Sequence, residues 1–173
     1  FFLVPYLKRI KAGQSIKENG PTWHMSKQGT PTMGGLMFIA AIAVVCLSVG
    51  FECMAEGEYG HLFCLAFALV FGAIGFLDDY EKLKKKQNLG LTAGKKLLLQ
   101  LAAAVAFIFL MRRFGYVALD SLYIPFWNKT VPISEPLYVI FAAFVIVGTV
   151  NAVNLTDGVD GLAASTTMPV CIF

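Results

Sequence analysis

Four long apolar runs constrain the fold of this chain more than any other feature of its sequence. They lie at about 33–50, 61–77, 97–111 and 135–150. Of the 173 residues, 57% are hydrophobic and 14% are charged, a balance too apolar for an ordinary soluble domain. A membrane-spanning helix needs roughly 20 residues and tolerates tilt, and flanking semi-polar residues extend each run toward that length. We therefore expect an all-α fold, a polytopic transmembrane helical bundle.

Apolar residues also occupy both ends of the sequence. Residues 1–8 look like the last turns of a span, and residues 161–173 begin another. No internal repeat, low-complexity tract or linker divides the chain. We expect residues 1–173 to form a single membrane domain that is a fragment of a longer protein, with partial spans at both ends.

The basic residues are distributed unevenly between the polar stretches. Residues 8–32 and 78–96 are rich in lysine, whereas residues 51–60 carry only acidic charges. The positive-inside rule places the first two stretches in the cytoplasm and the third outside. Counting spans from this assignment places three motifs on the cytoplasmic face, where they can converge. These motifs are GTPTMGG, FLDDY and NLTDGVDG.

A stretch of mixed character at 114–134 separates the third and fourth apolar runs, on the outer side. It combines alternating apolar residues with Gly, Pro and aromatic residues. This pattern suits either a short hairpin or an interfacial segment, with Tyr123 and Trp127 at the level of the lipid headgroups. Both forms stay open.

The first motif, at 27–35, immediately precedes an apolar run. Pro31 suits the first turn of a helix and Thr30 its cap, and the unpaired N–H groups of a helix start attract anions. Lys27 adds a positive charge, so a phosphate could dock there. A helix start with glycines for close helix packing explains the same residues.

The second motif contains two adjacent carboxylates, Asp78 and Asp79, at the end of an apolar run. Neighbouring residues on a helix point about 100° apart, so the two side chains suit different tasks, such as one metal ligand and one base. The alternative is a solvated helix end whose carboxylates are neutralised by nearby lysines. These lysines are Lys82, Lys84, Lys85 and Lys86.

The third motif, at 151–162, repeats polar side chains at every third position. The four are Asn151, Asn154, Asp157 and Asp160. On a helical or tightly turning backbone they line up roughly along one side. Amides and carboxylates in such a row can hold Mg²⁺, orient phosphates or read a base, and Gly158 permits close approach of the backbone to a ligand. We interpret this motif as a binding site.

Together these segments resemble a known family. TPTMGG at 30–35, GFLDDYEK at 75–82 and NAVNLTDGVDGLA at 151–163 are similar to the signature segments of the phospho-N-acetylmuramoyl-pentapeptide transferases, the MraY-type enzymes of bacterial cell-wall synthesis. The resemblance covers the whole chain, in order. The second and third segments are shared across the wider superfamily of polyprenyl-phosphate sugar-1-phosphate transferases, and the TPTMGG form points to the muramoyl-pentapeptide branch.

The resemblance implies transfer of phospho-MurNAc-pentapeptide from UDP-MurNAc-pentapeptide to undecaprenyl phosphate, with Mg²⁺ as cofactor, giving lipid I and UMP. It implies a multi-pass protein of the bacterial inner (plasma) membrane, in contact with the lipid bilayer, with its active site on the cytoplasmic face. A homodimer is expected, and no nucleic-acid partner. Family members carry a third essential Asp and a histidine-rich loop further along, so we expect residues 1–173 alone to release no UMP.

The resemblance also implies roles for the motif residues. Asp78 and Asp79 would be catalytic: one deprotonates or orients the lipid phosphate and the other lies close to Mg²⁺, and we favour Asp78 as the base. The expected metal ligands are Asp79, Asp157 and Asp160. The expected substrate-binding residues are Lys27, Thr32, Asn151, Asn154, Asp157, Asp160 and Gly158. Lys95 or Lys96 either draws in the diphosphate or serves only as an inside-face charge. A direct displacement and a covalent aspartyl-phosphate route both stay open.

Two other functions fit parts of the sequence. A UDP-N-acetylhexosamine:polyprenyl-phosphate transferase would share the acidic motifs, and the choice of donor would separate it from the first hypothesis. A membrane transporter or cation channel would use intramembrane carboxylates as an ion path. Against transport, the carboxylates cluster at one face, and no pair of helices broken by Gly or Pro indicates an inverted repeat.

Overall fold

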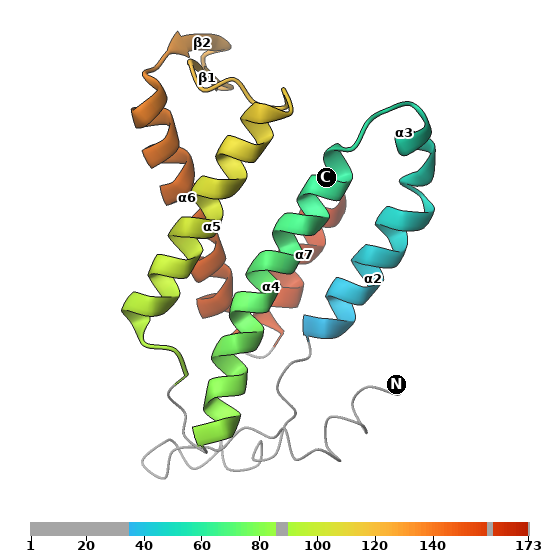
Figure 1. The fold of residues 1–173 in the computed structure, drawn as a ribbon, viewed down its shortest axis with the longest axis vertical. Coiled ribbons are helices and arrows are strands. Elements are labelled where there is room, and N and C mark those ends of the chain that lie inside the picture. Colours follow the sequence, from blue (N-terminus) through green and yellow to red (C-terminus); the bar gives the residue numbers. More distant parts are fainter. Residues whose placement is uncertain (1–34, 86–89, 159–160, 173) are drawn as a thin grey trace. The chain divides into compact units, whose positions relative to one another are not determined.

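The computed structural model describes residues 35–85, 90–158 and 161–172, and it is mostly helical (Figure 1). Its elements in chain order are α2 (Gly35–Ser48), α3 (Phe51–Ala55), α4 (Gly60–Lys85), α5 (Ala93–Arg113), β1 (Ser121–Ile124), β2 (Lys129–Pro132), α6 (Glu135–Thr156) and α7 (Leu162–Ile172).

Within the described ranges, three helical stretches are long and apolar enough to cross a membrane. They are Gly60–Lys82, Ala93–Arg113 and Glu135–Thr156. The helix α2 is also apolar, and 14 of its residues lie within the described range. The expectation of an all-α membrane protein is confirmed.

Large apolar side chains cover the outside of these helices. Phe38 on α2, Leu98 on α5 and Phe144 on α6 are all exposed, while the buried apolar residues are few and include Ile74 and Ala104. An apolar surface of this extent is typical of helices that face lipid instead of water. The chain is therefore an integral membrane protein.

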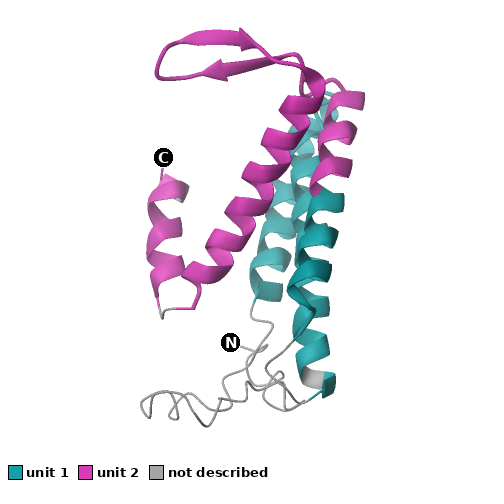
Figure 2. Ribbon diagram, turned by 90° about the vertical axis from the view of Figure 1, so that its left-hand side faces the viewer, with its two compact units in different colours: residues 1–103 teal, residues 104–173 magenta. Residues whose placement is uncertain are grey.

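The chain forms two compact units, residues 1–103 and residues 104–173 (Figure 2). In the first unit, α2 packs against α4. Gly72 makes room for this contact, because a Cβ atom added there would lie 2.6 Å from the Cδ1 atom of Ile39. After its apolar part, α4 continues to Lys85 with three lysines in its last turn, where positive charge complements the helix dipole.

The second unit contains an antiparallel β-hairpin between α5 and α6. Its register pairs Ser121 with Pro132, Leu122 with Val131, Tyr123 with Thr130 and Ile124 with Lys129. In the turn, Asn128 adopts a φ of 50° and its Oδ1 atom accepts a 2.6 Å hydrogen bond from the Tyr123 hydroxyl. Asn tolerates this left-handed conformation better than most residues. Of the two forms expected for residues 114–134, the structure has the hairpin.

An ion pair and a proline lie at the start of α6, in the same unit. Arg112, in the last turn of α5, pairs with Glu135, the first residue of α6. Pro136 occupies the first turn of α6, where its missing N–H would have no partner in the helix. The ends of α5 and α6 at the hairpin are thus held together by the covalent hairpin and by one charged contact.

Candidate active site

The first group of candidate residues lies in unit 1, where α4 is approached by the chain segment that leads into α5. Asp78 follows the apolar part of α4 and is only 8% exposed. Gly90 lies against it: a Cβ atom added to Gly90 would be 2.6 Å from the Asp78 carbonyl oxygen and 2.9 Å from the Asp78 carboxylate carbon. The absence of a side chain at Gly90 therefore allows this segment to approach α4.

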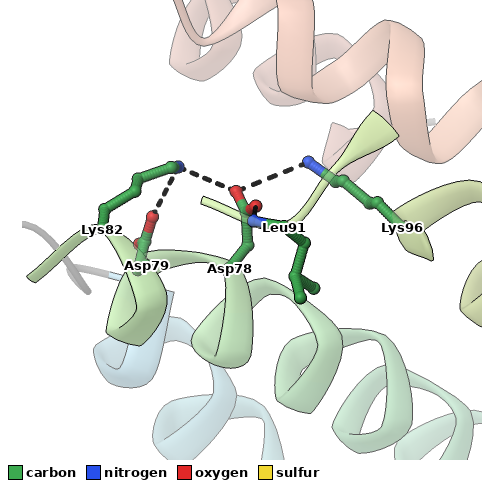
Figure 3. Close-up of polar contacts among 5 residues, drawn as sticks. All are labelled: Asp78, Asp79, Lys82, Leu91 and Lys96. Carbon is green, nitrogen blue, oxygen red and sulfur yellow. Dashed lines mark hydrogen bonds and ion pairs between the residues drawn. The ribbon is translucent and has the colours of Figure 1, made fainter. Parts of the chain in front are cut away.

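The two oxygens of the Asp78 carboxylate have different partners (Figure 3). The backbone N–H of Leu91 donates a 2.9 Å hydrogen bond to Oδ1. The ammonium group of Lys82 lies 2.8 Å from Oδ2, and that of Lys96, in the first turn of α5, lies 3.8 Å from the same oxygen. A carboxylate accepts hydrogen bonds only, and here donors approach both of its oxygens.

Asp79 shares one of these cations but is more open. Lys82 donates a 3.0 Å hydrogen bond to Asp79 Oδ1, and the Asp79 side chain is 31% exposed against 12% for Asp78. Residues three and four positions apart on a helix are neighbours, so one lysine at position 82 reaches both carboxylates. The acidic pair therefore consists of one enclosed carboxylate and one accessible carboxylate.

The lysines that follow the acidic pair in the sequence have different partners in the structure. Lys82 neutralises the acidic pair, as the alternative reading of this motif expected, whereas Lys85 pairs with Glu81. Lys96 also reaches Asp78, so it is more than a dispersed inside-face charge. Sequence reasoning did not single out Gly90 or Leu91. A glycine just before a helix start was the only available signal.

The second group lies in unit 2, at the C-terminal end of α6. Asn151 Nδ2 donates a 2.8 Å hydrogen bond to the Val147 carbonyl oxygen. Asn154 is exposed one turn later, and the helix ends at Thr156 with Asp157 as its C-cap. Because Asp157 keeps a right-handed helical conformation (φ −71°, ψ −3°), the spacing of three residues continues from the helix into its cap.

Glycines follow this cap. The Gly158 N–H donates a 3.1 Å bond to the Leu155 carbonyl oxygen, and Gly161 has a φ of 76°, a conformation that glycine adopts at little cost. Gly158 therefore closes the last turn of α6, and Gly161 lies directly before α7 in a conformation that favours glycine.

Three predicted site residues lie outside the described residues: Lys27, Thr32 and Asp160. Those that are described fall into two groups, Asp78 and Asp79 in unit 1, and Asn151, Asn154, Asp157 and Gly158 in unit 2. The convergence of the two groups on one site stays a prediction.

The acidic residues fit Mg²⁺ by their chemistry. Within the parts of the chain that the structure describes, no three His, Cys, Asp or Glu side chains gather into a metal-binding cluster. Mg²⁺, however, is usually held by one or two carboxylates together with phosphate oxygens of the substrate. The accessible Asp79 and the exposed Asp157 are carboxylates of this kind. The prediction of Mg²⁺ therefore stays open and does not require a cluster of three protein ligands.

Comparison with known proteins identifies two matching family models. The model described as "Glycosyl transferase family 4" matches residues 61–173. The model described as "Phospho-N-acetylmuramoyl-pentapeptide-transferase signature 1" matches residues 27–39. The signature contains Lys27 and Thr32, and the family model contains all the other predicted site residues, so every one of them falls inside a matched region.

Individual relatives carry the same description. Proteins named phospho-N-acetylmuramoyl-pentapeptide-transferase from Staphylococcus carnosus, Staphylococcus aureus and Staphylococcus haemolyticus are 46%, 48% and 48% identical to the chain over 162 residues. Each alignment covers 93% of this chain and 50% of the relative. The chain thus spans about half the length of the curated relatives it matches.

Proposed function

Because this chain belongs to glycosyl transferase family 4, and within it to the phospho-N-acetylmuramoyl-pentapeptide transferases, we propose that the full-length protein transfers phospho-MurNAc-pentapeptide from UDP-MurNAc-pentapeptide to undecaprenyl phosphate. An oxygen of the lipid phosphate forms a bond to the sugar-linked phosphorus of the donor. The bond from that phosphorus to the UMP oxygen breaks, so that lipid I and UMP are the products. The reaction belongs to peptidoglycan synthesis.

The observation that supports this chemistry best is the pair of lysines beside the acidic pair of α4. A phosphate monoester has a second pKa of about 6, so the attacking lipid phosphate is mostly a dianion near pH 7. It must approach a diphosphate that is also negative, and positive groups aimed at the reacting oxygens offset this repulsion. The ammonium groups of Lys82 and Lys96 lie within 3.8 Å of one oxygen of Asp78, which fixes two positive charges in one place.

Asp78 and Asp79 take different parts in this proposal. Asp78, enclosed by donors, orients the two ammonium groups. Since most of the lipid phosphate is already a dianion near pH 7, Asp78 orients it through these two ammonium groups, which a proton on Oδ2 would release. Asp79, the accessible carboxylate, would hold Mg²⁺ together with Asp157 and Asp160. When bound, Mg²⁺ would neutralise negative charge on the diphosphate and on the leaving UMP.

The remaining residues complete the site on the cytoplasmic face of the bacterial inner membrane. The positive-inside rule supports this placement, because with the lysine-rich stretches 8–32 and 78–96 in the cytoplasm the order of spans would bring all three motifs to one face. Substrate contacts are assigned to Lys27, Thr32, Asn151, Asn154, Asp157, Asp160 and Gly158. The enzyme acts as a homodimer in this proposal.

The other hypotheses are less favoured. A UDP-N-acetylhexosamine:polyprenyl-phosphate transferase would retain the acidic motifs, but the match at residues 27–39 is to a signature of the muramoyl-pentapeptide enzymes. The names of the similar proteins likewise describe a transferase and not a transporter.

The test measures UMP release by the full-length protein in detergent with Mg²⁺ and undecaprenyl phosphate. UDP-MurNAc-pentapeptide and UDP-GlcNAc are offered in parallel. We expect release from the muramoyl donor alone, and loss of release in Asp79→Asn. Glu81→Gln is the matched control, since Glu81 is an acidic residue of the same helix that pairs with Lys85 outside the site. Release from UDP-GlcNAc would move the protein to the hexosamine transferases, and no release from either donor would contradict the proposal.

A further inference from the structure

The contact between Asp78 and Leu91 joins a helix to a segment 13 residues further along the chain. Leu91 lies two residues before α5 and uses its backbone N–H, so the bond does not depend on the nature of the residue 91 side chain. Figure 3 shows the Asp78 carboxylate with this N–H on one oxygen and the two lysines on the other. The N–H therefore fixes the rotation of the carboxylate about its Cβ–Cγ bond.

Gly90 is the residue that allows this contact. A Cβ atom at position 90 would overlap both the backbone carbonyl and the carboxylate carbon of Asp78, at 2.6 Å and 2.9 Å. The carboxylate can rotate away, but the carbonyl oxygen belongs to the backbone of α4 and cannot, so the overlap with it is relieved when the segment withdraws from α4. Withdrawal would lengthen or break the hydrogen bond from Leu91.

We propose that Gly90 and the Leu91 N–H form a positioning element, which holds Asp78 Oδ1 so that Oδ2 presents Lys82 and Lys96 to the phosphate groups of the substrates. This inference rests on the proposed function. Neither Gly90 nor Leu91 is required to touch substrate. They act through the orientation of Asp78.

Asp78 could serve only to attach the segment to α4, or it could also orient the two lysines. Removing its charge distinguishes these two roles. An asparagine at position 78 could accept the same hydrogen bond from Leu91 through its amide oxygen, without the cost of enclosing an ionised group. A carboxylate is needed only if the second oxygen must also attract the two ammonium groups. Asp78→Asn should therefore keep the segment in place and lose the lysine arrangement, whereas Asp78→Ala should lose both.

The first measurement is hydrogen exchange at the Leu91 amide in the full-length protein, which requires no activity. We expect slow exchange in the wild type and in Asp78→Asn, and faster exchange in Asp78→Ala and Gly90→Ala. Gly94→Ala is the matched control, because Gly94 has no atom within 4 Å of an added Cβ and should exchange like the wild type. Equal exchange in the wild type and Asp78→Ala would overturn the contact.

The second measurement is the kinetics of UMP release. Displacement of a catalytic geometry by about 1 Å costs up to about a hundredfold in rate, so Gly90→Ala should lower kcat between about tenfold and a hundredfold, with a change in donor KM below about threefold. Gly94→Ala should keep the wild-type kcat. Faster exchange in Gly90→Ala with unchanged kcat would overturn the positioning role. A wild-type protein that exchanges as expected but releases no UMP would instead contradict the proposed function.

Discussion

Among the residues that the structure describes, Lys82 is the cation that contacts both carboxylates of the acidic pair, and replacing it by methionine removes both contacts. The ammonium group lies 2.8 Å from Asp78 and 3.0 Å from Asp79, and methionine keeps most of the length and packing of the stem. The change leaves Asp78 with Lys96 and Leu91 as partners, while Asp79 loses its contact with residue 82. We therefore expect the coupling energy between Lys82 and Asp78 to differ from that between Lys82 and Asp79.

Burial sets the expected magnitudes. Breaking a buried ion pair costs about 3–5 kcal/mol, whereas an exposed pair contributes about 0–1 kcal/mol. The side chains of Lys82 and Asp78 are 35% and 12% exposed, so this pair lies between the limits, and we expect a coupling energy of about 1–2 kcal/mol. Asp79, at 31% exposure, should couple to Lys82 by less than about 1 kcal/mol.

Two double-mutant cycles measure these energies separately. Lys82→Met is combined with Asp78→Asn in one cycle and with Asp79→Asn in the other, and the unfolding free energy of the full-length protein is measured in detergent. A third cycle, with Lys85→Met and Glu81→Gln, is the control, because that pair is more exposed and should couple more weakly than Lys82 with Asp78. Coupling to Asp79 as strong as coupling to Asp78 would refute the assignment of enclosed and accessible carboxylates.

The hairpin and the end of α5 beside it yield two smaller predictions. At the hairpin turn, Phe126 and Trp127 are 96% and 72% exposed. In a protein whose other tryptophans are replaced by Phe, we expect the fluorescence of Trp127 to be quenched more by lipids brominated near the headgroup than by lipids brominated at the chain ends. The absence of quenching would place the turn in water. Arg112→Met should destabilise the protein by less than about 1 kcal/mol, because Arg112 and its partner Glu135 are both nearly half exposed; a larger loss in thermal unfolding would show that this pair is shielded from solvent.

The helices were predictable from the apolar runs, but their ends were not. The run at 61–77 belongs to a helix that continues to Lys85. The apolar run ends where the polar residues begin. The helix continues beyond that point, because pairs of opposite charge four residues apart, such as Glu81 with Lys85, stabilise it. The run at 135–150 likewise belongs to a helix that ends at Thr156, whose hydroxyl donates to the Ala152 carbonyl oxygen four residues earlier.

The site divides into a local part and a part that requires the folded chain. The contacts of Lys82 with the acidic pair follow from helical spacing alone, and the sequence predicts Lys82 as one of four neutralising lysines. The contacts of Leu91 and Lys96 with Asp78 span 13 and 18 residues along the chain. They depend on how the segment before α5 returns to α4, which no periodicity of the sequence encodes.

Lys96 shows why such a contact points to function. It lies in the first turn of α5, where the positive end of the helix dipole disfavours a cation. Its side chain is only 21% exposed, so water does not fully compensate it. Asp78 is similarly unfavourable as an isolated charge, since it is enclosed near the end of an apolar helix. Asp78 has one partner within its own helix, Lys82, whereas Lys96 gains the contact with Asp78 only when α4 and α5 meet. A chain selected for stability alone would hold this junction with apolar or neutral groups. Charges retained at such a cost are expected where a charged substrate binds.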